Sequence, residues 1–147
     1  MAYTTDFIGH VEVRPGLNEA EVAYLMAFAA LFLAIRQPPH ADRVIGSMLS
    51  FFWIWMGAVY HLGFFTAINP AAYVFGVAFV LQGLLFLAFG AIAPKLAFRF
   101  RRDGYGLAGG LLMLYALVVY PVIGAFAGHG YPHAPLFGVA PCPTTIF

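Results

Sequence analysis

His61 offers the richest chemistry among the few polar side chains in the long apolar runs of this sequence. It lies in the uncharged run 44–68, where Trp53, Gly57 and His61 recur every four residues and therefore share one face of a helix. In one interpretation, its imidazole forms a hydrogen bond with a neighbouring helix, through Gln82 or a tyrosine hydroxyl. In the other, the neutral imidazole is a ligand for haem, a chlorin or a metal ion. The tyrosines in these runs are Tyr60, Tyr73, Tyr115 and Tyr120.

A second set of donor atoms lies near the C-terminus. His129, His133 and Cys142 supply nitrogen and sulfur donors, which suit a soft metal ion, with or without His61. Their spacing matches no compact zinc motif. The alternative is that both histidines are solvated in a Gly- and Pro-rich tail and that Cys142 is held rigid for packing. The sequence itself requires no cofactor.

Other catalytic and transport signatures are missing from the apolar runs. The runs 44–68, 70–93 and 104–127 contain no carboxylate, lysine or arginine, and such groups build most proton relays and ion pathways. The sequence also lacks a nucleophile motif, a Gly-rich phosphate loop and a CxxC pair. We therefore expect that this protein is not an enzyme, and an ion-coupled transporter is disfavoured. With no basic run of the nucleic-acid type, we expect no nucleic-acid partner.

The composition places these residues in a membrane. Hydrophobic residues make up 63% of the 147 residues, charged residues make up 9%, and the mean hydropathy is +0.87. A soluble domain carries about 25% charged residues. This chain has too few charges to cover a water-facing surface, so the lipid bilayer is its expected solvent. Because lipid cannot satisfy backbone polar groups, we predict an all-α, polytopic transmembrane helical bundle.

Four segments have the length and apolarity of membrane spans, which need about 20 residues. The predicted helices cover residues 20–36, 44–68, 70–93 and 104–127, between an N-terminal segment, 1–19, and a Pro- and Gly-rich tail, 128–147.

Helix boundaries are also marked by residue type. Glu19 and Glu21 suit the start of the first helix. Asn69 and Pro70 suit the N-cap and first position of the third, which makes helices two and three a tight antiparallel hairpin. Pro121 lies inside the fourth helix and predicts a kink near Tyr120.

Charge asymmetry predicts the orientation. Six of the seven basic residues flank the first and third loops, 36–43 and 94–103, which share one side in a four-span chain. These six are Arg36, Arg43, Lys95, Arg99, Arg101 and Arg102. Basic loops stay in the cytoplasm, so we expect both ends of the chain outside the bacterial inner membrane.

Small residues predict where the helices pack. Glycines permit close approach of helices in a bilayer, and the expected packing positions occur in all but the first helix. They are Gly57, Gly76, Gly83, Gln82, Gly106 and Gly110, and Gly90 continues the seven-residue spacing of Gly76 and Gly83. Trp53 and Trp55 lie well inside the second span, so at least one of them should face protein, a bound lipid or a pigment.

Two groups of motifs carry a family resemblance. The runs FWIWMGAVYH at 52–61, INPAAYVFG at 68–76 and FVLQG at 79–83, with GHGYP at 128–132 and PCPTTIF at 141–147, resemble the DUF6064 family of bacterial membrane proteins of unknown function. The resemblance covers most of the chain from about Leu17. It implies about six helices, of which this sequence would hold four, so that the chain is expected to be either a short form or part of a longer protein in which a fifth helix follows Phe147. It implies no activity.

Three functions fit these observations. The first is a non-catalytic accessory subunit that packs beside membrane-protein partners in a larger complex, such as a photosynthetic or respiratory assembly. The second is a metal- or tetrapyrrole-binding membrane protein that uses His61, His129, His133 and Cys142. The third is a small-solute carrier, which the missing charges disfavour.

Overall fold

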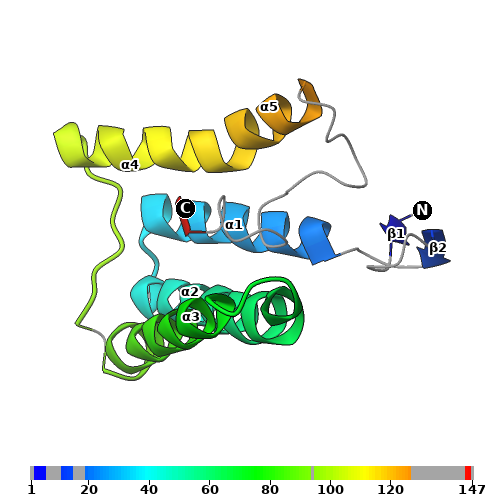
Figure 1. Ribbon diagram of the computed structural model, residues 1–147. Helices are drawn as coiled ribbons and strands as arrows, with labels where there is room; N and C mark the ends of the chain where they lie inside the picture. Colours follow the sequence, from blue (N-terminus) through cyan, green and yellow to red (C-terminus); the bar gives the residue numbers. More distant parts are fainter. Residues whose placement is uncertain (1, 6–10, 15–18, 94, 127–144, 147) are drawn as a thin grey trace. The chain divides into compact units, whose positions relative to one another are not determined.

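The computed structural model describes residues 2–5, 11–14, 19–93, 95–126 and 145–146, and most of them are helical (Figure 1). The predicted helical membrane class is confirmed, because three helices in the described part are long and apolar enough to cross a membrane. They are Ala41–Ala67, Ala72–Ile92 and Gly104–Gly124. The chain divides into two compact units, residues 26–109 and residues 1–25 with 110–147.

The first helix, α1, spans Glu19–Arg36, close to the expected 20–36. It is not one of the three candidate spans, since Glu19, Glu21 and Arg36 all lie within its 18 residues. The helix ends because Gln37 adopts a left-handed conformation with φ of 50°. Its backbone N–H still donates to the Leu33 carbonyl at 2.8 Å, a common way to close a helix C-terminus.

The second span begins as helix α2, Ala41–Trp55, and continues through a π-helical segment, Met56–Phe64, and a 3₁₀ turn, Phe65–Ala67. It therefore starts three residues before the expected boundary at 44. The third span consists of α3, Ala72–Phe86, followed by the π-helical segment Leu87–Ile92. Runs of π-helix are rare, and in other proteins they concentrate at functional sites.

The turn between these two spans is as short as the sequence indicates. Asn69 Oδ1 accepts a hydrogen bond from the Ala71 N–H at 3.0 Å, so Asn69 caps the first turn before α3. Pro70 follows at a position where its missing N–H removes no helical bond. Figure 1 shows α2 and α3 lying side by side, as this turn requires.

A column of close backbone contacts joins α2 to α3. A Cβ atom placed on Gly46 would lie 2.7 Å from the Gly90 carbonyl carbon, and one on Gly57 would lie 2.8 Å from the Gly76 carbonyl oxygen. Between them, a Cβ on Gly83 would lie 3.1 Å from the Ser50 carbonyl oxygen. Real Cβ atoms essentially never come within 3.0 Å of such atoms, so the contacts at Gly46 and Gly57 require glycine, and the contact at Gly83 is tighter than most that a Cβ makes.

The final helical stretch combines α4, Gly104–Leu114, a π-helical segment, Tyr115–Val119, and α5, Tyr120–Phe126. Figure 1 shows the direction change where α5 begins, at the predicted kink. Pro121 has no N–H to donate to the Leu117 carbonyl four residues earlier. The Tyr24 hydroxyl donates to that carbonyl instead, at 3.0 Å. The proline thus creates a free acceptor that a side chain distant in sequence occupies.

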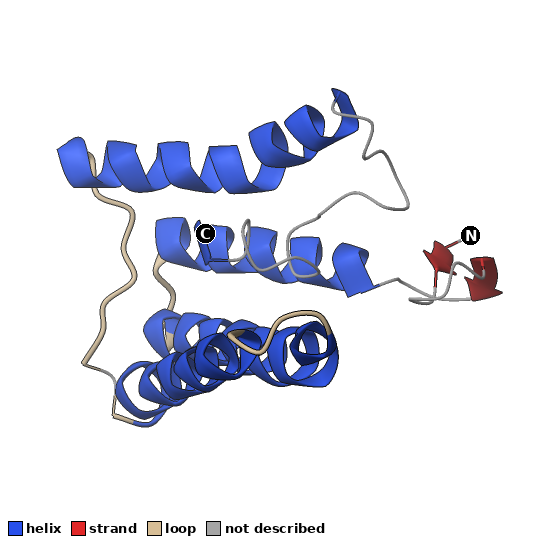
Figure 2. Ribbon diagram, in the orientation of Figure 1, coloured by secondary structure: helices blue, strands red, loops and turns tan. Residues whose placement is uncertain are grey.

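A short hairpin near the N-terminus was not anticipated by the sequence analysis. Strands β1, Ala2–Thr5, and β2, Val11–Arg14, pair antiparallel, with Tyr3 opposite Val13 (Figure 2). They lie within the segment 1–19 that precedes the helices.

Candidate functional site

His61 lies in the π-helical segment and is enclosed by aromatic rings. It is 6% exposed. The Phe79 ring stands edge-on to the imidazole with centroids 4.6 Å apart, and the Tyr60 ring is also edge-on at 5.2 Å. Phe65 and Phe75 complete this aromatic enclosure at 6.3 and 6.1 Å. An imidazole at such a site is shielded from water by both helices of the hairpin.

Neither ring nitrogen of His61 has a hydrogen-bond partner among the described residues. The expectation that His61 ties two helices together through Gln82 or a tyrosine hydroxyl is therefore wrong. Gln82 lies too far along α3 to reach His61. Gly57 lies against Gly76, which sets the level of α3 near His61, and Gln82 lies more than one helical turn beyond Gly76, away from the turn that joins the two spans. Gln82 is half-buried.

A buried imidazole without partners loses its hydrogen bonds to water, and no hydrogen bond within the protein replaces them. Leaving one buried polar group unsatisfied costs about 1–3 kcal/mol. The neutral ring offers one N–H donor and one bare nitrogen acceptor, so it can serve a ligand that both accepts and donates, or coordinate a metal ion. Because the ring is so enclosed, the packing favours a ligand of a few atoms over a tetrapyrrole, which needs a wide open face.

The face of the second span that the sequence marked as Trp53, Gly57 and His61 is the face that meets α3. Trp53 contacts Phe79 at a centroid distance of 4.7 Å, and Phe79 also contacts His61. Gly57 lies between them against Gly76. Trp55 points elsewhere: it is 37% exposed and stacks on Phe51 of its own helix at 5.9 Å. Of the two tryptophans, Trp53 is thus the one that faces protein.

Other predicted site residues are placed differently. Gly106 serves the turn before α4, because a Cβ there would overlap the Arg101 carbonyl oxygen, and Gly110 is half-buried further along the helix. His129, His133 and Cys142 lie outside the described residues. Within the described part of the chain, no group of three or more His, Cys, Asp or Glu is placed to hold a metal ion.

The two basic loops form a second polar region, and the bonds that connect them were not predicted from the sequence. Gln37 Nε2 donates to the Phe98 carbonyl at 2.6 Å and to the Ala34 carbonyl at 3.0 Å. Asp42 Oδ1 accepts from the Phe98 N–H at 2.8 Å. The Phe100 N–H donates to the Ala34 carbonyl at 3.1 Å. Three of these bonds, those of Phe98 and Phe100, hold the loop 95–103 against the end of α1 and the α1–α2 connection.

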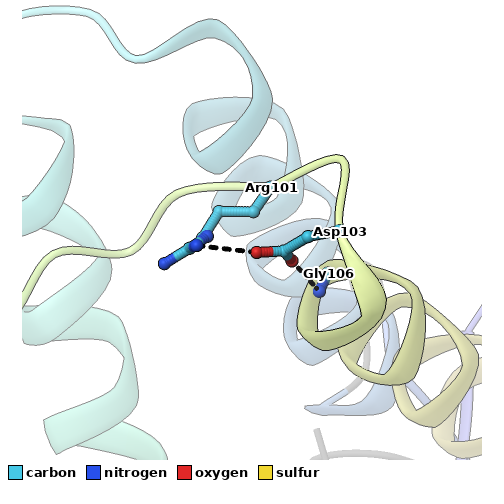
Figure 3. Close-up of polar contacts among 3 residues, drawn as sticks. All are labelled: Arg101, Asp103 and Gly106. Atoms are coloured by element: carbon cyan, nitrogen blue, oxygen red, sulfur yellow. Dashed lines mark hydrogen bonds and ion pairs between the residues drawn. The ribbon is translucent and has the colours of Figure 1, made fainter.

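Asp103 organises the start of α4 (Figure 3). One carboxylate oxygen accepts from the Gly106 N–H at 2.9 Å, which is the N-cap bond to the third helical residue. The other oxygen lies 2.7 Å from Arg101 Nη2. Both carboxylates of the two loops, Asp42 and Asp103, are thus occupied by bonds within the loops or at their edge.

Comparison with protein families matches residues 18–147 of this chain to the model of a family of unknown function, DUF6064. The chain belongs to this family. No curated protein matches it, and no solved structure matches it. The matched residues include the helical hairpin, the His61 enclosure and both basic loops, so these features lie within the family domain.

Proposed function

We propose that this family member is a non-catalytic accessory subunit that packs beside other proteins in a larger membrane complex. The observation that carries the proposal is the surface of α4. Among the residues that the structure describes, none buries a residue of α4, and none has an atom within 4 Å of a Cβ placed on Gly109. In a bilayer, a glycine on an open helix face permits the close approach of another helix. A face with this shape suits a partner helix.

The Trp53–Phe79 contact and the glycine column also support this proposal. They make the α2–α3 hairpin a closely packed unit that needs no substrate or cofactor to hold its helices together. Respiratory and photosynthetic complexes are suitable hosts, because both contain many small helical subunits.

Gly109→Leu tests the proposal directly. Purification of the tagged full chain from its native membrane in a mild detergent should recover it with other membrane proteins, and Gly109→Leu should release it. Leu111→Trp is the matched control, because it adds bulk about 200° around the same helix. A wild-type chain that is recovered as a free monomer would contradict the proposal, as would equal loss of partners in both variants.

We propose that the two basic loops face the cytoplasm and both ends of the chain face outward. Support comes from the hydrogen bonds that join the two loops, since joined loops must share a side. Single cysteines at Arg43 and Arg99, in a Cys142→Ser background, should react with a membrane-impermeant maleimide in inside-out vesicles and not in spheroplasts. Labelling from opposite sides would exclude this topology.

A second function is favoured by one specific observation, the two partnerless nitrogens of His61. We propose that the imidazole binds a metal ion or a small polar molecule within the aromatic enclosure. Protein from native membranes should carry a bound species, detected by elemental analysis, visible absorption or mass spectrometry, that His61→Phe lacks and Tyr73→Phe retains. Wild-type protein without any such species would rule this function out.

A further inference from the structure

The basic loops have more cationic groups than their own carboxylates can neutralise. Six lysine and arginine side chains project from them, against Asp42 and Asp103. All six basic residues are exposed, whereas both aspartates are half-buried. Asp42 is used by the Phe98 N–H, and Asp103 by Arg101 and the Gly106 N–H. The basic residues are Arg36, Arg43, Lys95, Arg99, Arg101 and Arg102.

Hydrogen bonds between the loops bring several of these cations together. Arg36 precedes Gln37, Arg43 follows Asp42, and Arg99 follows Phe98. Gln37 and Asp42 both bond to the Phe98 backbone, and neighbouring Cα atoms are about 3.8 Å apart. The backbones of three arginines therefore start within one residue of the same hydrogen-bonded cluster. We call Gln37, Asp42 and Phe98 the loop clasp.

Two of the six cations, one of them already counted beside the clasp, contact aromatic rings near the helix ends. The Arg36 guanidinium lies 5.6 Å from the centre of the Phe32 ring, and Lys95 Nζ lies 5.6 Å from that of Phe89. Both charged groups thus lie over an aromatic ring near the end of a helix, which is a cation–π arrangement. The Phe98 ring packs 6.5 Å from Phe86, so the clasp is seated on the end of the hairpin.

We propose that the loop clasp and its arginines form a binding site for the phosphate headgroup of an anionic phospholipid. Arginine binds phosphate through two parallel N–H donors. The clasp lies at the ends of helices that are long enough to cross a bilayer, which is the depth at which headgroups lie. A lipid phosphate is therefore held at the site by its own acyl chains, whereas a free phosphate ion is not.

The alternative that must be separated from this site is diffuse attraction by positive charge. A basic residue near an anionic membrane surface strengthens binding roughly fivefold regardless of its exact position. The two ideas differ at the clasp. Asp42→Ala removes a carboxylate and raises the net charge by one, so diffuse attraction of the lipid would strengthen. The same substitution removes the bond to Phe98, so binding at a site that depends on the clasp would weaken. Gln37→Ala changes no charge and removes two bonds.

Native mass spectrometry of the full chain in a neutral detergent, titrated with phosphatidylglycerol or phosphatidylcholine, tests the site. Wild-type protein should bind phosphatidylglycerol at least about tenfold more tightly than it binds phosphatidylcholine. Gln37→Ala and Asp42→Ala should each weaken that binding several-fold, and Arg43→Ala with Arg99→Ala should weaken it about 25-fold, at fivefold per residue. Arg14→Ala, which removes a positive charge from β2, should leave it unchanged.

Four results would overturn the proposal. Equal affinity for the two lipids would exclude an anionic headgroup site. Tighter binding by Asp42→Ala with no change in Gln37→Ala, or equal weakening by Arg14→Ala, would show diffuse attraction. Displacement of the lipid by millimolar inorganic phosphate would show that the arginines bind the free ion as well as the lipid and that the acyl chains contribute nothing.

Discussion

The two ends of the α2–α3 hairpin treat polar groups in opposite ways. At the end near the basic loops, Gln37 and Asp42 bond to backbone groups of a loop about sixty residues away. At the other end, His61 is enclosed by four aromatic rings and has no partner among the described residues. The first end has the chemistry of a membrane surface, where polar atoms satisfy one another. The second end keeps a reactive group without a partner.

That difference indicates where a ligand has something to gain. At the loop end, the backbone bonds are already made, and only exposed cations are available for a charged partner. At the His61 end, a ligand would satisfy a group whose isolation costs the chain about 1–3 kcal/mol. Between the two ends lies the glycine column, which holds the helices at a distance set by backbone contact. Changes to the column should disturb both ends together.

The largest effect is expected at Gly46. Gly46→Ala places a methyl group against the Gly90 backbone, which cannot move aside as a side chain would, and overpacking of this kind costs about 1–3 kcal/mol. Unfolding in mixed detergent micelles should show this loss. Gly109→Ala is the matched control: it has open space around the new methyl and should be neutral or slightly stabilising. Equal effects of the two substitutions would mean that helices α2 and α3 do not touch at Gly46.

His61→Leu should act in the opposite direction on the isolated chain. Leucine fills a similar volume without burying unsatisfied nitrogens, so the free energy of unfolding should rise by about 1–3 kcal/mol. Unfolding in mixed detergent micelles measures this change in the free energy of unfolding. Leu62→Ala, in the same segment, is the control for the loss of side-chain atoms. A fall in stability after His61→Leu would show that the imidazole has a partner in the purified protein.

A smaller effect is expected at the N-terminus of α4. Asp103→Ala removes the cap to the Gly106 N–H and should cost about 1 kcal/mol. Asp103→Asn keeps a capping oxygen and loses only the ion pair with Arg101, whose side chain is 71% exposed, so it should stay close to wild type. Circular dichroism during thermal unfolding separates the two variants. Equal losses would assign the stabilisation to the ion pair instead of the cap.

The smallest effect is expected from Tyr24→Phe, which removes only the hydroxyl that bonds to the Leu117 carbonyl. Hydrogen bonds between helices in a membrane average about 0.6 kcal/mol. The loss should nevertheless exceed that of Tyr105→Phe, because the Tyr105 side chain is 85% exposed. The two variants are compared by unfolding in the same micelles. A Tyr24→Phe variant as stable as wild type would show that Leu117 finds another donor.

Periodicity alone was enough to place Trp53, Gly57 and His61 on one face of a helix, and charge counting grouped the two basic loops. Asn69 and Pro70 predicted the turn before α3, and Pro121 predicted the kink, because each of these residues acts on the backbone of its own segment. Composition determined that most of the chain is helical and lipid-facing, since lipid leaves the backbone no other way to satisfy its polar groups.

Only the tertiary structure decided which residues meet. Gly46 and Ser50 are small residues four positions apart, but nothing in that local pattern names Gly90 as the residue that Gly46 meets in the antiparallel hairpin. Gln37 and Asp42 find Phe98 because two loops distant in sequence meet at one end of the helices. His61 lies among Phe75 and Phe79 instead of beside Gln82, because the register of the glycine contacts sets which turn of α3 it faces. Local patterns determine faces and ends, whereas register across a pair of helices depends on how their backbones fit together.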